Sequence, residues 1–453
     1  MCSTLSKSVH VAIVCGALAA NAPAQNVSEG SETISEIIVT ATKRSESVQD
    51  VPLAVSAFDA EQLQKTGVAN VREMVRLVPS LRISGAQAES FNANITIRNL
   101  GTNSTNIGVE SAVGVFVDGV YRSRSNVSII DLPGLERLEV LRGPQGTLFG
   151  INTSVGAVNV ITKAPGFEPE FNLDASIGNL DLREIGVGAT GPLNDRIALR
   201  FDGALQQRDG FIRDVVNDQD VRERDRYTLR GQALWRPYES FNLRLIGDYS
   251  LYDEDIAGGV PYKTLAPLAA VSFAGAGAPN SVLDYAVQRT PGRSGRALVE
   301  QWGLSGEAAW DLPFGTLTSI TAYRDWKSVF GADIDGSSLD LVYINYGEQS
   351  NQLRTLTEEL RLQGTTGKLD WLVGAFYLNE KADAPFQLRF GADLQPYLEN
   401  LFSNIFGSPF TYPVTIPGGT GPGTEDFKQE NRSYALFTHN TYHLTDRWAL
   451  TAG

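Results

Sequence analysis

From Phe171 onward, apolar and polar residues alternate over many separate segments of the chain. A period of two is the pattern of β-strands that have one apolar face. The strands expected from it are 171–177, 183–190, 197–203, 227–235, 241–249, 300–311, 315–327, 354–363, 368–380, 431–443 and 446–453. Many of these roughly eleven segments approach the ~9–11 residues with which a tilted β-strand crosses a bilayer.

The connections between these strands alternate in length. Short turns are expected at 191–195, 237–240, 312–314, 364–367 and 444–445, and long segments at 208–224, 253–299, 328–353 and 381–430. A membrane β-barrel has short turns at one rim and long loops at the other, whereas a soluble sandwich has no reason to keep this order. Aromatic residues near strand ends, such as Trp235 and Tyr238, fit the interfacial girdles of a barrel. The pattern therefore predicts an all-β, antiparallel transmembrane barrel.

The first residues have the features of an export signal. Lys7 is followed by a 12-residue, mainly apolar run from Val9 to Ala20, and Ala22-Pro23-Ala24 then fits a cleavage site. This run is shorter than the ~20 residues that a transmembrane helix needs. We therefore predict a cleaved signal peptide at 1–24, whose removal would take away both cysteines of the chain. The formal net charge of −14 argues against a nucleic-acid partner.

Residues 45–165 are expected to form an α/β domain. Asp59 fits the N-cap of a helix over 60–66 that Gly67 would end. A second helix is expected after Asn70, because apolar residues recur at helical spacing up to Pro79. Strands are expected at 95–98, 113–117, 138–141 and 158–162.

A glycine-rich loop follows the third of these strands. Its spacing matches neither G-x-G-x-x-G nor the G-x-x-x-x-G-K-[ST] pattern of phosphate-binding loops. We therefore expect a tight structural loop built on Gly143, Pro144, Gly146 and Gly150.

Three motifs of this domain resemble those of one family. The run E-R-L-E-V-L-R-G-P-Q-G-T-L-F-G at 136–150, continued by V-N-V-I-T-K at 158–163, strongly resembles the plug signature of TonB-dependent outer-membrane receptors. The runs V-F-V-D-G-V-Y at 115–121 and I-R-N-L-G at 97–101 resemble two further plug motifs. Asn99, Ile151 and Val155 stand where the family commonly has Gly, Arg and Gly, which concerns local loop conformations.

The resemblance implies a barrel whose lumen holds an N-terminal plug. Barrels of this plugged type close with ~22 strands, so the roughly eleven expected here predict a fragment of a parent of about 700–800 residues. The expected domains are a signal peptide at 1–24, an N-terminal extension at 25–44, the plug at 45–165 and a partial barrel at 166–453. Half a barrel is not expected to close a pore, because its edge strands would be unpaired in lipid.

The resemblance also gives a role to the extension. Glu36, Ile37, Ile38, Val39, Thr40 and Ala41 form a segment similar to the TonB box. In this family the box pairs as an added strand with the energising protein TonB, and the backbone supplies most of the contact. The alternative is an ordinary disordered tail.

Residues 358–362 resemble a barrel-strand motif in which carboxylates meet plug arginines. Period two predicts that Leu360 faces lipid and that Glu359 faces the lumen. We expect Glu359 to pair with Arg98 or Arg142 as a latch that holds the plug. The alternative is a solvated charge in the lumen.

These features predict a receptor in the Gram-negative outer membrane for active uptake of a scarce, large solute, driven by TonB and the proton gradient. The family makes a ferric siderophore or another iron chelate the default solute, with cobalamin, haem or a glycan as alternatives. A passive porin-like channel and a secreted β-rich hydrolase are the competing classes. The expected partners are TonB, outer-membrane lipid and the solute.

We expect no enzymatic activity, no cofactor and no metal site. His439 and His443 stand at i and i+4, which on a strand separates them by about 13 Å. The long segments 253–299 and 381–430 are the expected external loops. The aromatic residues of the second either bind a ring-bearing solute or pack the loop together.

Overall fold

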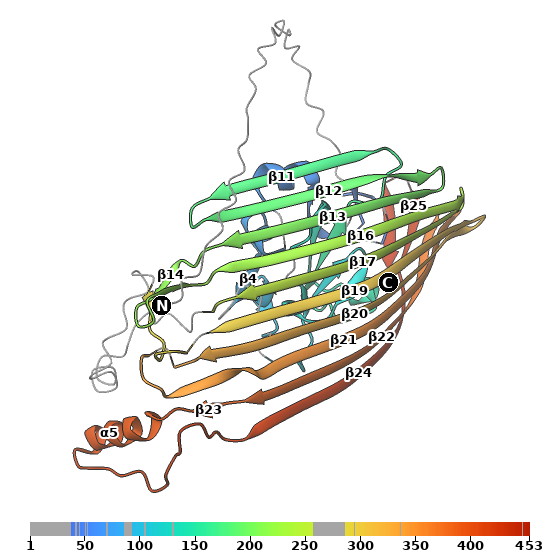
Figure 1. Ribbon diagram of the computed structural model, residues 1–453. Coiled ribbons are helices and arrows are strands. Elements are labelled where there is room, and N and C mark those ends of the chain that lie inside the picture. The colour runs from blue at the N-terminus through green and yellow to red at the C-terminus, as the bar shows by residue number, and fades with distance from the viewer. Residues whose placement is uncertain are drawn as a thin grey trace, which may run out of the picture. The chain divides into compact units, whose positions relative to one another are not determined.

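The computed structural model describes residues 38–40, 43–44, 46–49, 51, 53–68, 71–85, 93–103, 106–128, 131–256, 286–293, 295–335, 337–445 and 447–453. All of these residues belong to one compact unit, Ile37–Gly453. They form an N-terminal α/β domain and a sheet of thirteen strands, drawn in Figure 1.

Neighbouring strands of the large sheet follow one another along the chain and pair antiparallel (Figure 1). The path of the sheet is β11 (Glu170–Gly178), β12 (Leu182–Asn194), β13 (Ile197–Arg208), β16 (Arg224–Tyr238), β17 (Phe241–Glu254), β19 (Arg296–Leu312), β20 (Gly315–Asp333), β21 (Val342–Thr366), β22 (Leu369–Gln387), β25 (Asn440–Thr445) and β26 (Trp448–Ala452). The strands β23 (Arg389–Phe390) and β24 (Thr424–Thr438) pair with β21 and β22.

The alternation of residue types sets which face of each strand is covered. On β16, Arg230 and Leu234 are buried, whereas Leu229 and Trp235 are exposed. On β21, Glu359 is buried and Leu360 is exposed, as period two predicts. One face of the sheet therefore carries apolar side chains outward, and the other carries polar and charged side chains toward the N-terminal domain.

Several strands extend beyond their predicted ends. Most of 328–353, expected as a long loop, belongs to β20 and β21, because the ladder between them continues almost to their connection. The segment predicted as one strand at 431–443 is divided at His439 into β24 and β25, both of which pair with β22.

The N-terminal domain is built on a five-stranded sheet in the order β3-β9-β10-β7-β8, in which β10 and β7 are parallel. Its strands are β3 (Ala54–Asp59), β7 (Val113–Val117), β8 (Val120–Arg122), β9 (Leu135–Arg142) and β10 (Gly156–Thr162). A second sheet contains β4 (Leu81–Gly85), β5 (Ala93–Ile97) and β6 (Leu100–Gly101), and β1 (Ile38–Val39) pairs with β2 (Glu46–Ser47).

Helix α1 (Ala60–Thr66) confirms the predicted caps. The carboxylate of Asp59 accepts a hydrogen bond from the amide of Gln62, and Gly67 ends the helix in a left-handed conformation. The segment predicted as a second helix is instead a 3₁₀ helix, η1 (Val71–Arg76). Pro79 prevents its extension, because the residue before a proline avoids the α-helical conformation. Two four-residue helices, α2 (Ser125–Ser128) and α3 (Gly146–Phe149), complete the domain.

The domain packs its own core and also packs against the large sheet. Apolar residues of η1, β5, β7, β9 and β10 form the inner core. A second cluster joins Phe116 and Phe149 of the domain to Leu372, Phe376 and Phe437 of the sheet. The large sheet is therefore the wall against which the N-terminal domain is docked.

Two groups of elements lie beyond the long strands. The strands β14 (Ile212–Asp214), β15 (Gln219–Val221) and β18 (Ala286–Val287) form a small sheet, and helix α5 (Leu394–Phe406) lies between β23 and β24. Among the helices of the described ranges, none has the length and apolar character needed to cross a membrane.

Candidate functional site

The described part of the predicted TonB box is docked onto the N-terminal domain. Ile38 and Val39 form β1, while Glu36, Ile37 and Ala41 lie outside the described residues. Val39 is fully buried in the cluster that joins the domain to the wall. The short β1–β2 ladder shows that this segment adopts the extended backbone that strand addition requires.

Thr40 continues this attachment through Glu139 of β9. The amide of Thr40 donates to Glu139 Oε1 at 2.8 Å, and the same oxygen accepts from Arg137 Nε at 2.7 Å. Asn159 Nδ2 donates to the other carboxylate oxygen at 3.0 Å. Glu139 is fully buried, so Arg137 and Asn159 hold its carboxylate in place beneath the segment.

Lys43 fastens the next part of the segment to the wall. Its Nζ lies 3.0 and 2.8 Å from the two carboxylate oxygens of Glu359 on β21, and both side chains are at most 6% exposed. The ammonium also lies 4.6 Å from the ring centre of Phe149. Burial lowers the pKa of Lys43, while attraction by Glu359 opposes that shift. Arg361 shares Glu359 at 2.8 Å.

The latch partners predicted for Glu359 are therefore wrong. Arg142 Nε instead donates to the carbonyl of Ala54 at 3.2 Å, because β9 pairs with β3 at this point. Arg98 is exposed in the tight turn between β5 and β6, with a positive φ of 53°. Glu359 does face the domain and is buried, but the cation that reaches it comes from the N-terminal extension.

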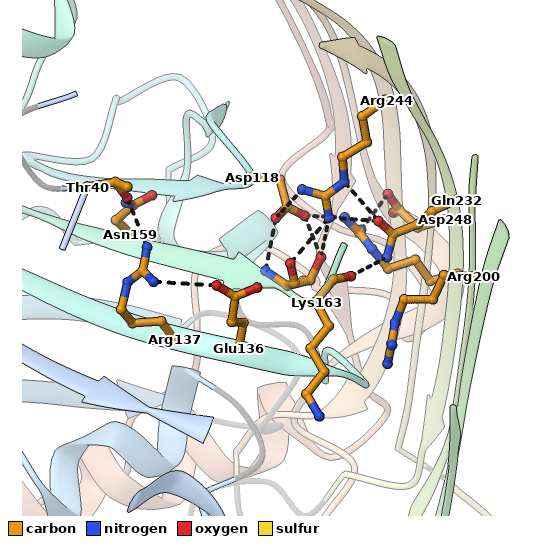
Figure 2. Close-up of polar contacts among 12 residues, drawn as sticks. Thr40, Asp118, Glu136, Arg137, Asn159, Lys163, Arg200, Gln232, Arg244 and Asp248 are labelled. Carbon is orange, nitrogen blue, oxygen red and sulfur yellow. Dashed lines mark hydrogen bonds and ion pairs between the residues drawn. The ribbon is translucent and has the colours of Figure 1, made fainter. Parts of the chain in front are cut away.

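A second contact with the wall forms at Asp118, in the two-residue turn between β7 and β8. Asp118 and Gly119 both have positive φ, as a type I′ hairpin turn requires. The carboxylate accepts from the amide of Thr162 at 2.9 Å and is ion-paired with Arg230 of β16. Arg244 of β17 lies 3.5 Å from its other oxygen, and Figure 2 shows this arginine approaching from the wall.

The wall arginines are also connected to one another through Asp248 of β17. Arg324 Nη2 lies 2.5 Å from Asp248 Oδ1, and Arg230 Nη1 lies 3.5 Å from Asp248 Oδ2. The side chain of Arg122, on β8, is buried beside this group. The turn at Asp118 is thus inserted into a cluster of charged wall residues.

A third contact links the end of β8 to β22. Arg124 Nη2 lies 2.6 Å from Glu380 Oε1, and Ser123 Oγ donates to the same carboxylate. Arg124 Nε also donates to the carbonyl of Ile107 at 2.7 Å. The two charged side chains are at most 3% exposed, so this is a buried ion pair between the domain and the wall.

The glycine-rich loop serves docking. Gly143 and Gly150 have φ of 97° and 67°, and the amide of Gly150 donates to the carbonyl of Gly146 at 2.9 Å to close helix α3. Pro144 lies between Gly143 and α3. The loop places Phe149 in the apolar cluster against the wall.

The external aromatic residues pack partly on one another. Phe402 lies 5.1 Å from Phe410, and Phe406 lies 5.9 Å from Phe410, measured between ring centres. Phe406 is nonetheless 62% exposed, so part of this cluster faces solvent. Among the described residues, no group of three or more His, Cys, Asp or Glu side chains is placed to hold a metal ion. His443 Nε2 instead lies 2.7 Å from Asp370 Oδ2.

An α/β domain docked on a sheet of long antiparallel strands, with charged side chains on the docked face, is the arrangement of a plug packed against part of a β-barrel wall. Residues 47–157 match the family described as the TonB-dependent Receptor Plug Domain. This match assigns the N-terminal domain to that plug-domain family, and the domain is called the plug below.

Relatives with curated descriptions agree with this family. The iron-regulated outer membrane virulence protein of Vibrio cholerae serotype O1 is 28% identical over 225 residues, which are 46% of this chain and 32% of that protein. The pesticin receptor of Yersinia pestis is 29% identical over 195 residues, 42% of this chain and 28% of that protein. The matches thus span about a third of these relatives' length.

Solved structures support the fold. The crystal structure of the ferric yersiniabactin uptake receptor from Yersinia pestis matches with a TM-score of 0.64 and 15% identity, covering 88% of this chain and 63% of that one. At this identity the likeness concerns the fold.

Most of the docking residues were missed from the sequence alone. Lys43 follows the predicted box and Asp118 lies within the motif at 115–121, but neither pattern by itself predicts a contact with the wall. Arginines on the buried face of successive strands, such as Arg230 and Arg244, were the available signal, because buried arginines need an acidic partner.

Proposed function

We propose that this chain forms the plug and part of the barrel of a receptor for TonB-driven uptake of a scarce solute across the outer membrane. The observation that carries the proposal is the fastening of the extension by Lys43 to Glu359 of the wall. An extension that pairs with TonB must stay attached to the receptor until TonB binds it. The buried ion pair provides that hold, at the point where the extension meets both plug and barrel.

The pairing with TonB uses the backbone of the box. Ile38 and Val39 are already extended, and TonB would take the place of β2 as their strand partner. The Ile38→Pro substitution removes a backbone donor and is expected to abolish energised uptake while the protein still reaches the outer membrane.

The matched control for this experiment is Ile38→Ala, which keeps the backbone donor and should retain uptake. Receptor level is measured in outer-membrane fractions, and uptake with a radiolabelled solute. Normal uptake by the Ile38→Pro variant would contradict the box assignment.

The hold by Glu359 is tested with Glu359→Gln. This change leaves Lys43 buried beside a neutral partner, and loss of one member of a buried pair typically costs ~3–5 kcal/mol. The extension should therefore leave its site more often, which thiol labelling of a reporter at Ser47→Cys measures as a faster rate. Ser47 is buried in the docked segment.

Glu358→Gln is the control for this change. Glu358 is adjacent on β21 but bonds Ser319 Oγ at 2.8 Å on the neighbouring strand. Equal labelling rates in the Glu359→Gln and Glu358→Gln variants would exclude a hold at Glu359.

An iron chelate is the solute class that the relatives favour. One relative is described as iron-regulated, and one solved structure as a ferric yersiniabactin uptake receptor. Growth of a deletion strain on single ferric chelates, and on haem, cobalamin or glycans, identifies the solute. Growth loss confined to a glycan would replace the iron assignment.

The competing class is a passive porin-like channel. Removal of residues 36–41 discriminates between the two, because a channel would conduct as before while a receptor would bind its solute without importing it. The proposed activity needs no covalent chemistry, so we propose that the protein is not an enzyme.

A further inference from the structure

Six charged side chains meet where the turn at Asp118 enters the wall, and we call them the arginine joint. The plug and three strands of the wall contribute to it. Its members are Asp118 and Arg122 of the plug, Arg230 of β16, Arg244 and Asp248 of β17, and Arg324 of β20.

The arginine joint is not electrically balanced. It contains four arginines and two aspartates, a surplus of two positive charges. Both aspartates are shared, since Asp118 faces Arg230 and Arg244 while Asp248 faces Arg230 and Arg324. The acidic groups are therefore already occupied by the arginines of the wall.

Arg122 receives none of these contacts. Its side chain is buried, and within the described part of the chain its Nε and Nη1 atoms have no hydrogen-bond partner. Burial lowers the pKa of Arg122 to about 10. Asp248 and Asp118 oppose this shift, and Arg230 adds to it. The guanidinium still carries its charge at neutral pH.

A buried charge whose N–H groups lack hydrogen-bond acceptors destabilises the state in which it is buried, even where carboxylates attract it from nearby. The docked plug is that state here, because Arg122 lies in the plug and the surplus charge lies on the wall. Arg124, two residues along the chain, shows the opposite arrangement, with an ion pair to Glu380 and a bond to the carbonyl of Ile107. The plug therefore presents to the wall one arginine that strengthens docking and one that weakens it.

We propose that the arginine joint is a release point of the docked plug, and that Arg122 keeps docking weaker at this point than the other contacts would make it. The inference rests on the proposed function, in which the plug must move for the solute to pass. A joint that buries a charge with unsatisfied N–H groups separates with less work once the extension is pulled. Arg122 thus sets how readily the plug leaves the wall.

The test measures plug docking directly in the full chain, purified in detergent. Val127 is buried in one apolar cluster with Trp326 of the wall, so a Val127→Cys reporter should be labelled by a thiol reagent only when the plug leaves the wall. Cys2 and Cys15 are replaced by serine for this purpose. In a fixed, sub-denaturing concentration of urea, Arg122→Gln is expected to slow labelling about ten-fold, which corresponds to ~1.4 kcal/mol of stronger docking.

Arg124→Gln is the matched control, since Arg124 has similar burial and the same chemistry but is paired. It should accelerate labelling about ten-fold, because Glu380 then loses its partner. Arg122→Met serves as a second variant in case glutamine perturbs folding, which heat-modifiable mobility on gels reports. Labelling by both Arg122 variants at the wild-type rate or faster overturns the proposal.

Asp118→Asn separates electrostatics from packing. It raises the surplus to three positive charges, so the slowing produced by Arg122→Gln should be larger in this background than in the wild type. Additive effects would mean that Arg122 acts through packing and would overturn the proposal. These outcomes do not depend on uptake, whereas failure of the Ile38→Pro test would remove the proposed function and leave the measured docking intact.

Discussion

Gly150 satisfies two separate requirements at one position of the docking loop. Its φ of 67° is in the left-handed region, and an added Cβ would lie 2.9 Å from Cδ1 of Phe437 on the wall. The left-handed backbone is required by the loop itself, whereas the absence of a Cβ is required by the close approach of the wall. A glycine in a family motif can therefore be explained by geometry at this site.

The two requirements are separated by comparing Gly150→Ala with Gly67→Ala. Gly67 has the same left-handed backbone, φ 66°, but no atom within 4 Å of its added Cβ. Left-handed backbone costs an alanine ~1–2 kcal/mol, so both variants should lose about that much stability. Gly150→Ala should in addition accelerate labelling at Val127→Cys. Equal labelling in the two variants would mean that Phe437 moves aside without cost.

Among the elements, the small external sheet of β14, β15 and β18 is held by a buried arginine. Arg289 Nε lies 2.7 Å from Asp214 Oδ2, and its Nη1 lies 3.0 Å from Asp255 Oδ1. Burial raises the pKa of Asp255 to about 6, with Arg289 opposing the shift. The carboxylate of Asp255 therefore binds a proton in the folded loop at a pH where the unfolded loop releases it.

This shift predicts how the small sheet responds to pH. Between the usual value of 3.8 and about 6, the folded state binds more protons than the unfolded state, so local stability falls as the pH rises through this window. Hydrogen exchange of β14 and β15, normalised for intrinsic rates, should show less protection at pH 7 than at pH 4. Asp255→Asn should flatten this dependence. Asp220→Asn, an exposed acid of the same sheet, should leave it unchanged.

Sequence patterns predicted well the features that depend on neighbouring residues and predicted poorly those that depend on residues far away in the chain. The caps of α1 at Asp59 and Gly67 and the strand β7 were found at their predicted positions, because capping and alternation act within a few residues. The length of β20 and β21 was underestimated, since pairing across the ladder stabilises polar segments that alternation alone does not mark. The latch partners were wrong for a related reason. No local pattern indicates that Lys43, more than 300 residues from Glu359, reaches it first.

At the scale of the whole molecule, plug and wall differ in their tryptophans. All six tryptophans of the chain lie at or after Trp235, in the strands of the wall. Trp326 is 1% exposed and lies in one buried apolar cluster with Ile107 and Val127 of the plug. The fluorescence of Trp326 should therefore indicate whether the plug is docked on the wall.

Release of the plug in urea should move Trp326 into a more polar environment and shift its emission to longer wavelength. The shift should come at a lower urea concentration than the loss of β-sheet circular dichroism, because the plug is held by polar contacts while the wall is held by long ladders. Trp326→Phe should abolish the early shift, whereas Trp310→Phe, on an exposed site of β19, should retain it. A single transition in both signals would show that plug and wall unfold together.

The two faces of each long strand place a constraint on how such a wall can change. Arg226 and Arg230 differ by four positions, an even number, so both face the plug. Leu229 is one position away from Arg230 and therefore faces outward. One inserted residue would reverse the alternation for the part of the strand beyond it, so plug-facing charges there would point outward and apolar side chains would point toward the plug. Variation of the wall should then proceed by substitution, or by insertions of two residues, and single-residue insertions should be confined to the connections between strands.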